Sequence, residues 1–368
     1  MSETTNLLRT PLADVHQELG AKMVEFGGWL MPVHYTSILQ EHKAIRSTAG
    51  LFDISHMGEL VVKGTGSEAW VNSLFCNDIR KISPGWGQYT LLLNESGGTV
   101  DDLIIYRLAD QEFLLVVNAS QIEKDFKWLE RRLGPNVTIE NQSEEFAAIA
   151  LQGPKSEGVF RKLFDSEKRP LKRNQFIETP YKGKSVLVAR TGYTGEDGFE
   201  IFLSPELATP LWKDLLKHGE LVSCVSAGLG CRDTLRLEAC YPLYGHELSQ
   251  SISPLEAGLD HFVSFDKPEK FVGNEPLREQ KESGITRSVA AFEITGPGAP
   301  PRAQYPVFAK NNQIGEVTSG SHSPTLNKGI GLALIARDFA KPGTEIEIEV
   351  RGKRQPARVV KKPFYSNL

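Results

Sequence analysis

Short apolar runs of strand length recur through the first two-thirds of the chain. They are separated by Gly, Asn, Asp and Ser, the residues that favour turns, and lie at 59–62, 88–93, 103–108, 113–117, 146–151, 186–189 and 199–203. Neighbouring runs leave little room for the crossover helices that parallel strands require. The pattern therefore predicts antiparallel sheets in an α+β body rather than a doubly wound α/β sheet.

Helical periodicity is clearest after Ser120. Ser120 and Glu123 have the spacing of a capping box, apolar residues follow at helical intervals as far as Leu133, and Gly134-Pro135 ends the pattern. Weaker patterns of the same kind predict further helices, at 36–49, 67–75 and 154–164. The body is therefore expected to mix helices with its sheets.

The character of the chain changes after Gly284. Strand-like runs alternate there with Gly, Pro and Asn turns and show no helical period, at 289–294, 313–318, 329–335, 345–350 and 357–360. This predicts a small C-terminal β-barrel or sandwich, and the charged stretch 267–282 is expected to be a linker. We therefore predict an α+β body over residues 1–283, built as two intertwined subdomains, and a C-terminal β domain over residues 284–368.

Composition adds limits but no function. The chain has 368 residues, enough for two or three domains, with 46 acidic and 42 basic residues. This mild negative balance argues against extensive binding to nucleic acid or to an anionic membrane. The basic run 351–362 is interpreted as a solvated strand face. No apolar stretch reaches the ~20 residues of a spanning helix, and the N-terminus lacks the features of a signal or transit peptide. The expected location is the cytoplasm.

Common catalytic and metal signatures are missing. The four cysteines form no C-x-x-C pair, the eight histidines are scattered without an H-E-x-x-H helix, and we expect no metal site. There is also no G-x-S-x-G elbow and no P-loop. The stretch 228–233 begins like a dinucleotide fingerprint but has Asp233 in place of the third glycine, which disfavours a nicotinamide or ATP enzyme.

Acidic residues at strand positions are the strongest chemical signal. Asp101 and Asp102 open an apolar strand, where successive side chains point to opposite faces, so only one of them can enter a pocket. The pattern does not choose between the faces, and a pair that caps a turn would look the same. Glu200 follows a glycine-rich turn and lies within the next strand. It is either a buried recognition carboxylate or an outward-facing strand residue.

Taken together, the motifs resemble the T protein family of the glycine cleavage system over nearly the whole chain. The segments that carry the resemblance are Arg9-Thr-Pro-Leu, 20–32, 52–59, 97–106, 190–200, Ala227-Gly-Leu-Gly-Cys-Arg-Asp, Arg236-Leu-Glu-Ala and Lys362-Pro-Phe. The resemblance implies a three-part fold around a central folate cavity, with a β-barrel as its C-terminal part.

The resemblance also implies an activity and a set of site residues. The expected reaction takes an aminomethyl group from the lipoyl arm of the H protein, releases ammonia, and forms 5,10-methylenetetrahydrofolate and the dihydrolipoyl arm, with tetrahydrofolate as cosubstrate. Asp102 matches the acid that approaches the folate nitrogens, and Glu200 and Arg232 match the pterin end. The residues that match the rest of the pocket lining are Met57, Tyr89, Asn118, Tyr193 and Tyr241.

The chain departs from the family pattern in two places, and two other functions remain open. Cys231 stands where many relatives have Ala, and Ser366-Asn367 lacks a basic residue that some relatives have. One alternative is the folate module of sarcosine or dimethylglycine oxidases, although the chain has no fingerprint for their FAD domain. The other is a non-catalytic folate-binding relative with a K-G-C-Y-x-G-Q-E motif, whose counterpart here, residues 240–247, lacks the Lys-Gly-Cys order.

Overall fold

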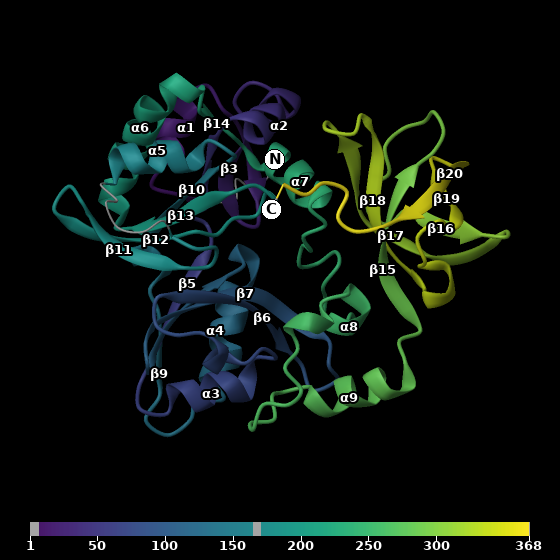
Figure 1. Cartoon of the computed structure of the whole chain (residues 1–368), viewed down its shortest axis with the longest axis horizontal. Coiled ribbons are helices and arrows are strands. Elements are labelled where there is room, and N and C mark those ends of the chain that lie inside the picture. Colours follow the sequence, from purple (N-terminus) through teal and green to yellow (C-terminus); the bar gives the residue numbers. More distant parts are fainter. Residues whose placement is uncertain (1–6, 165–170, 368) are drawn as a thin grey trace, which may run out of the picture.

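Three lobes make up the described part of the chain. The structure is a computed structural model that describes residues 7–164 and 171–367. In Figure 1 two lobes at the left form a mixed helix and sheet body, and a closed β-barrel stands at the right. The α+β class and the C-terminal barrel that the sequence predicted are thereby confirmed.

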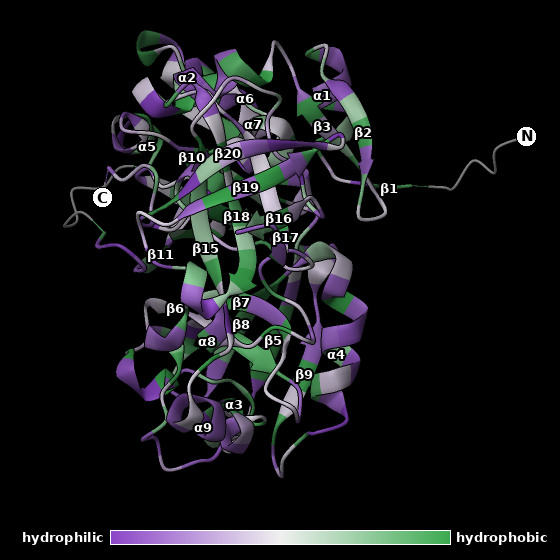
Figure 2. Cartoon of the chain, turned by 90° about the vertical axis from the view of Figure 1, so that its right-hand side faces the viewer, coloured by the Kyte–Doolittle hydropathy of each residue, from purple (hydrophilic) through white to green (hydrophobic). Residues whose placement is uncertain are grey.

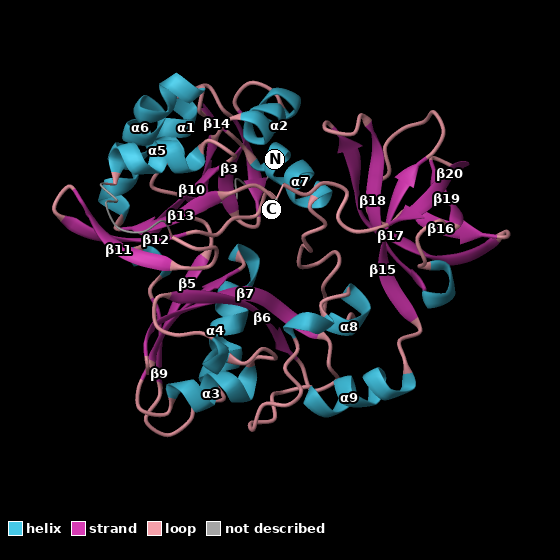
Figure 3. Ribbon diagram, in the orientation of Figure 1, coloured by secondary structure: helices cyan, strands magenta, loops and turns pink. Residues whose placement is uncertain are grey.

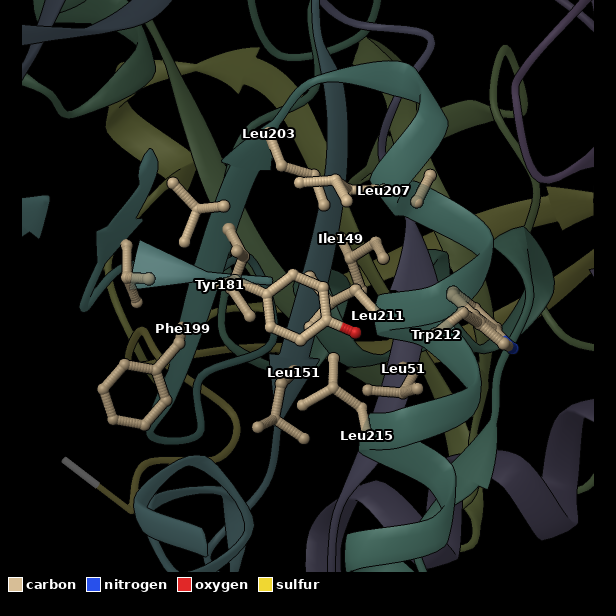
Figure 4. Close-up of a cluster of buried hydrophobic side chains, with 14 of the residues drawn as sticks. Leu51, Ile149, Leu151, Tyr181, Phe199, Leu203, Leu207, Leu211, Trp212 and Leu215 are labelled. Carbon is tan, nitrogen blue, oxygen red and sulfur yellow. The ribbon is translucent and has the colours of Figure 1, made fainter. Parts of the chain in front are cut away.

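A six-stranded sheet forms the upper lobe in Figure 1. In spatial order its strands are β11 (Phe176–Tyr181), β12 (Lys184–Ala189), β13 (Gly198–Leu203), β10 (Ala147–Gln152), β4 (Gly50–Asp53) and β14 (Val225–Ser226). All its pairs are antiparallel except β4 with β14. One face packs against helices α5 (Ser156–Leu163) and α6 (Ala208–Gly219), where Trp212 of α6 is fully buried in the same apolar cluster as Leu151 (Figure 4).

A five-stranded antiparallel sheet forms the lower lobe. In spatial order its strands are β6 (Trp86–Leu93), β7 (Thr99–Ala109), β8 (Glu112–Val117), β5 (Gly58–Lys63) and β9 (Thr138–Asn141). Its outer face is covered by α3 (Ser67–Leu74) and α4 (Ile122–Glu130), as Figure 3 shows. Its inner face meets the six-stranded sheet through an apolar layer that includes Phe52 and Phe202 from one sheet and Tyr106 from the other. The body is thus a helix, sheet, sheet, helix stack.

The remaining elements of the body lie around this stack. A small sheet has the order β1 (Leu8–Arg9), β3 (Trp29–His34), β2 (Lys22–Phe26), and the other helices of the body are α1 (Ala13–Glu18), α2 (Ile38–Ser47), α7 (Leu229–Glu238), α8 (Pro254–Ala257) and α9 (Asn274–Ser283). Short 3-10 turns occur at Ile79–Lys81, Ala119–Gln121, Ser143–Glu145, Pro205–Leu207, Glu220–Val222, Asp260–Phe262 and Arg337–Phe339.

Helix α7 packs tightly against β3 because its N-cap is a glycine. A Cβ atom at Gly228 would lie 2.4 Å from the carbonyl carbon of Val33, a distance that real side chains do not reach. This close approach sets the position of α7, and therefore of Arg232 in its first turn.

The barrel closes through six antiparallel strands. In spatial order they are β15 (Arg287–Ile294), β18 (Lys328–Ala336), β17 (Asn312–Ser323), β16 (Pro306–Ala309), β19 (Glu345–Val350) and β20 (Lys353–Val360). Alternate residues such as Phe292, Val317 and Ile348 fill its interior. Strands β15 and β18 are largely hydrophobic in Figure 2, because their other face packs against the body through residues that include Leu332.

Two local predictions were wrong. Ser120 and Glu123 form no capping box, because Ser120 lies within a 3-10 turn and its hydroxyl accepts a hydrogen bond from the side chain of Gln121 (3.0 Å) instead of from a helix amide. The helix itself is present as α4. The charged stretch 267–282, expected as a linker, contains most of α9, a helix that is mostly hydrophilic in Figure 2 and packs through Leu277.

Candidate functional site

A cavity of about 2010 Å³ lies where the two body sheets, α7 and the barrel meet. It is larger than the ~300–1,000 Å³ of a typical small-molecule site, so it has room for a drug-sized ligand together with a second group. All eight site residues that the family resemblance implied line this cavity: Met57, Tyr89, Asp102, Asn118, Tyr193, Glu200, Arg232 and Tyr241. Residues from distant parts of the chain are thereby brought together.

Asp102 faces the cavity from β7, as part of the strand face that carries Ile104 and Tyr106. The hydroxyl of Tyr89 donates to its Oδ2 (2.8 Å), and the side-chain amide of Asn118 donates to its Oδ1 (3.1 Å). Removal from bulk water, together with the negative charge of Asp101, raises the pKa of Asp102 to about 7. A carboxyl group with this pKa exchanges protons near neutral pH, which suits a general acid or base.

Asp101 points to the opposite face of β7 and does not line the cavity. The two acids are nevertheless linked through Asn118. The backbone N–H of Asn118 donates to Asp101 Oδ2 (3.2 Å), and its side-chain Nδ2 donates to Asp101 Oδ1 (2.8 Å) as well as to Asp102. Asn118 thus holds the negative charge of Asp101 next to the cavity carboxyl.

Glu200 is buried at the inner face of β13, between the two sheets. The hydroxyl of Thr191 donates to its Oε2 (2.5 Å) and also contacts the hydroxyl of Tyr106 (3.0 Å). Burial raises the pKa of this carboxyl, and the nearby Arg232 opposes the rise. The other oxygen of Glu200 accepts no hydrogen bond within 7–164 and 171–367, so it is available to a ligand with N–H donors.

Arg232 presents a cation to the cavity. Its guanidinium carbon lies 4.9 Å from the ring centre of Tyr193, a cation–π distance, and burial lowers its pKa from the usual value. Among the described residues its guanidinium has no hydrogen-bond or ion-pair partner. Tyr193 is stacked against Tyr241, with ring centroids 5.8 Å apart, and its hydroxyl donates to the carbonyl of Pro242. This part of the wall is therefore aromatic and carries the positive charge of Arg232.

Three residues near the site were missed by sequence reasoning. Tyr106 and Thr191 support Glu200, and Tyr106 could have been found because it lies on the same strand face as Asp102. His56, beside Met57, lines the cavity with its Nδ1 unpaired among the described residues. Burial, with a smaller contribution from Arg232, lowers the pKa of His56 to about 4, so its ring is neutral at physiological pH.

Two further features are absent from residues 7–164 and 171–367. Within the residues that the structure describes, no group of three or more His, Cys, Asp or Glu side chains is placed to hold a metal ion. No helix among these residues is both long and apolar enough to cross a membrane.

Known proteins resemble the chain over nearly its whole length. A family model described as the GCVT N-terminal domain matches residues 12–267, and one described as the glycine cleavage T-protein C-terminal barrel domain matches residues 287–366. Aminomethyltransferases of Geobacillus kaustophilus (strain HTA426) and Bacillus cereus (strain B4264) are 50% and 49% identical over 360 residues, which cover 98% of this chain and 99% and 98% of the relatives. The crystal structure of glycine cleavage system aminomethyltransferase T from Bartonella henselae matches with a TM-score of 0.91 and 34% identity, over 98% of both chains.

Proposed function

The chain belongs to the glycine cleavage T-protein family, and we propose that its central cavity is where the family's reaction takes place. That reaction makes the chain a tetrahydrofolate-dependent aminomethyltransferase. An aminomethyl group leaves the lipoyl arm of the H protein, ammonia is released, and 5,10-methylenetetrahydrofolate and the dihydrolipoyl arm are formed. The observation that carries the proposal is that the ionisable Asp102 lines the same cavity as Glu200, which has a carboxylate oxygen free to bind a ligand, and Arg232, whose guanidinium has no partner among the described residues.

The cavity residues fit tetrahydrofolate. The free oxygen of Glu200 and the unpaired guanidinium of Arg232 offer an acceptor and a donor group, which match the hydrogen-bonding edge of a pterin ring. Tyr193 and Tyr241 add flat apolar surface for the rest of the ligand, and Met57 adds flexible apolar contact. We assign Glu200 and Arg232 to the pterin end.

Asp102 is the proposed catalytic residue. When bound, tetrahydrofolate supplies the amine nitrogens that take up the one-carbon unit. The ionised carboxylate of Asp102 accepts the proton from the attacking amine and stabilises positive charge at the carbon from which ammonia departs. Tyr89 and Asn118 hold this carboxylate in one orientation by donating to different oxygens, so the side chain is positioned before the reaction begins.

Three broader assignments accompany this proposal. The partner that delivers the aminomethyl group is the lipoylated H protein, and we assign neither nucleic acid nor a membrane a part in the reaction. The working location is the cytoplasm. The chain divides functionally into a folate-binding body of residues 1–283 and a barrel domain of residues 284–368, a boundary that falls between α9 and β15.

An assay of ammonia release separates this function from its alternatives. Purified protein is mixed with tetrahydrofolate and aminomethylated H protein, and ammonia is measured with and without each component. We expect release that requires all three components. If the chain binds tetrahydrofolate but releases no ammonia, the non-catalytic folate-binding relative is the better description.

A further inference from the structure

Asp125 is a fully buried acid that the proposed reaction does not use. It lies in the first turn of α4, on the side of β7 that faces away from the cavity, with 0% of its surface exposed. Neither of its oxygens accepts a hydrogen bond from any N–H or O–H group in the described part of the chain. An ionised carboxylate in this position would have lost its water without replacement, which is strongly unfavourable.

The carboxyl of Asp101 lies within hydrogen-bonding reach of the carboxyl of Asp125. Two carboxylates have only acceptor atoms, so a hydrogen bond between them requires one to carry a proton. Asp101 accepts two hydrogen bonds from Asn118, which stabilise its ionised form, whereas Asp125 accepts none. The proton therefore belongs on Asp125.

We propose that Asp125 is a neutral positioning residue that donates its carboxyl proton to Asp101 and thereby keeps Asp101 ionised and Asn118 directed at Asp102. Hydrogen bonds then connect Asp125, Asp101, Asn118 and Asp102 in series, from the helix layer through the strand to the cavity. This inference rests on the proposed function in one respect, since its catalytic consequence assumes that Asp102 is the base.

The charges around Asp125 agree with this assignment. Burial and the neighbouring Asp101 raise the pKa of Asp125 to about 10, and the more distant Asp102 acts in the same direction. Lys124, the cation nearest in sequence, opposes this rise in pKa. Its ammonium group, however, donates hydrogen bonds to the carbonyl of Val100 (3.1 Å) and the hydroxyl of Tyr244 (3.1 Å). With Asp125 neutral, Asp101 is the negative charge that raises the pKa of Asp102.

Two substitutions of Asp125 test separately whether the residue is neutral and whether it donates a hydrogen bond. Asp125→Asn replaces the O–H donor by an N–H donor and leaves the site neutral, whereas Asp125→Leu has a similar size and no donor. Glu123→Gln is the matched control, because Glu123 is an exposed acid of the same helix turn. Infrared difference spectra of the ligand-free protein at pH 8 report the carbonyl stretch of protonated carboxyl groups. The pH profile of ammonia release reports the ionisation of Asp102.

We expect the wild-type minus Asp125→Asn spectrum to contain the band of one buried protonated carboxyl group that the variant lacks. The wild-type minus Glu123→Gln spectrum should contain no such band. The acidic limb of the pH profile should stay in place in Asp125→Asn. In Asp125→Leu it should move by about 1 pH unit toward lower pH, because an Asp101 without its donor takes up a proton and no longer repels charge on Asp102.

Two results would overturn the inference. One is an unchanged protonated-carboxyl signal in Asp125→Asn, and the other is a shift of the Asp125→Asn limb to lower pH, which would mean that Asp125 is charged. The infrared result stands even if Asp125→Leu does not fold. It also stands if the wild type releases no ammonia, in which case the proposed function fails while the position of the proton is still decided.

Discussion

Replacement of Asp102 by Asn removes the charge and keeps the shape of the side chain. The remaining carbonyl oxygen can accept from either Tyr89 or Asn118, but the new NH₂ group cannot accept from the other donor. The variant therefore loses the base and one of the two hydrogen bonds, while the aromatic wall and the pterin end are untouched. We expect turnover to fall by about 10²-fold or more, and folate still to bind.

The pH dependence of turnover gives a second, independent prediction. With the pKa of Asp102 at about 7, the ionised form makes up roughly a tenth of the molecules one pH unit below that value and roughly nine-tenths one unit above it. Wild-type turnover should therefore rise about tenfold from pH 6 to a plateau above pH 8. The Asp102→Asn variant should lose this limb, because no group with that pKa remains at the position.

Ammonia release from aminomethylated H protein, measured across this pH range at saturating tetrahydrofolate, tests both magnitudes. Calorimetry with tetrahydrofolate on the same preparation checks that binding is retained. Near-normal turnover in the Asp102→Asn variant, or a low-turnover variant with the same acidic limb as the wild type, would refute the assignment of the base.

Asp101→Asn should reduce turnover far less than Asp102→Asn and move the acidic limb to lower pH, since a neighbouring charge is removed; a collapse of activity confined to Asp101→Asn would reverse the roles of the two acids. Glu200→Gln should weaken tetrahydrofolate binding by about 1–3 kcal/mol, the cost of an unpaired buried polar group, and unchanged affinity by calorimetry would remove Glu200 from the pterin end. Glu59, buried at 1% exposure with an unpaired oxygen, has a pKa raised well above 4.5 by burial. Between pH 4.5 and the raised pKa of the folded state, the unfolded chain releases this proton and the folded chain keeps it. Glu59 therefore lowers the free energy of unfolding by about 1.4 kcal/mol for each pH unit in this range. Glu59→Gln should remove this pH dependence from the unfolding midpoint, whereas a Glu140→Gln control at an exposed position should not. An equal pH dependence of the midpoint in both variants would contradict the reasoning.

Local sequence patterns were enough for the outline of the fold. The alternation of apolar and polar residues after Gly284 predicted a β domain there, and the closed barrel confirms the class because a strand's period of two does not depend on distant residues. Five of the eight cavity residues that the resemblance nominated lie within contiguous motifs, which can be recognised without the tertiary structure. Ser120 shows the limit of such patterns. Its spacing from Glu123 suits a capping box, but a 3-10 turn precedes the helix and no box forms there. A capping box does form at the start of α8, between Ser253 and Glu256.

The placement of charges was decided only by the tertiary structure. The sequence established that Asp101 and Asp102 point to opposite faces of a strand, but which face meets a cavity depends on how two sheets, α7 and a barrel pack together. Asp125 had no signal at all, because an acid in a helix turn is ordinarily solvated. It became a buried neutral partner of Asp101 only when α4 covered the outer face of β7. Proximity between segments distant in the chain determines desolvation, and desolvation determines which of these acids holds a proton.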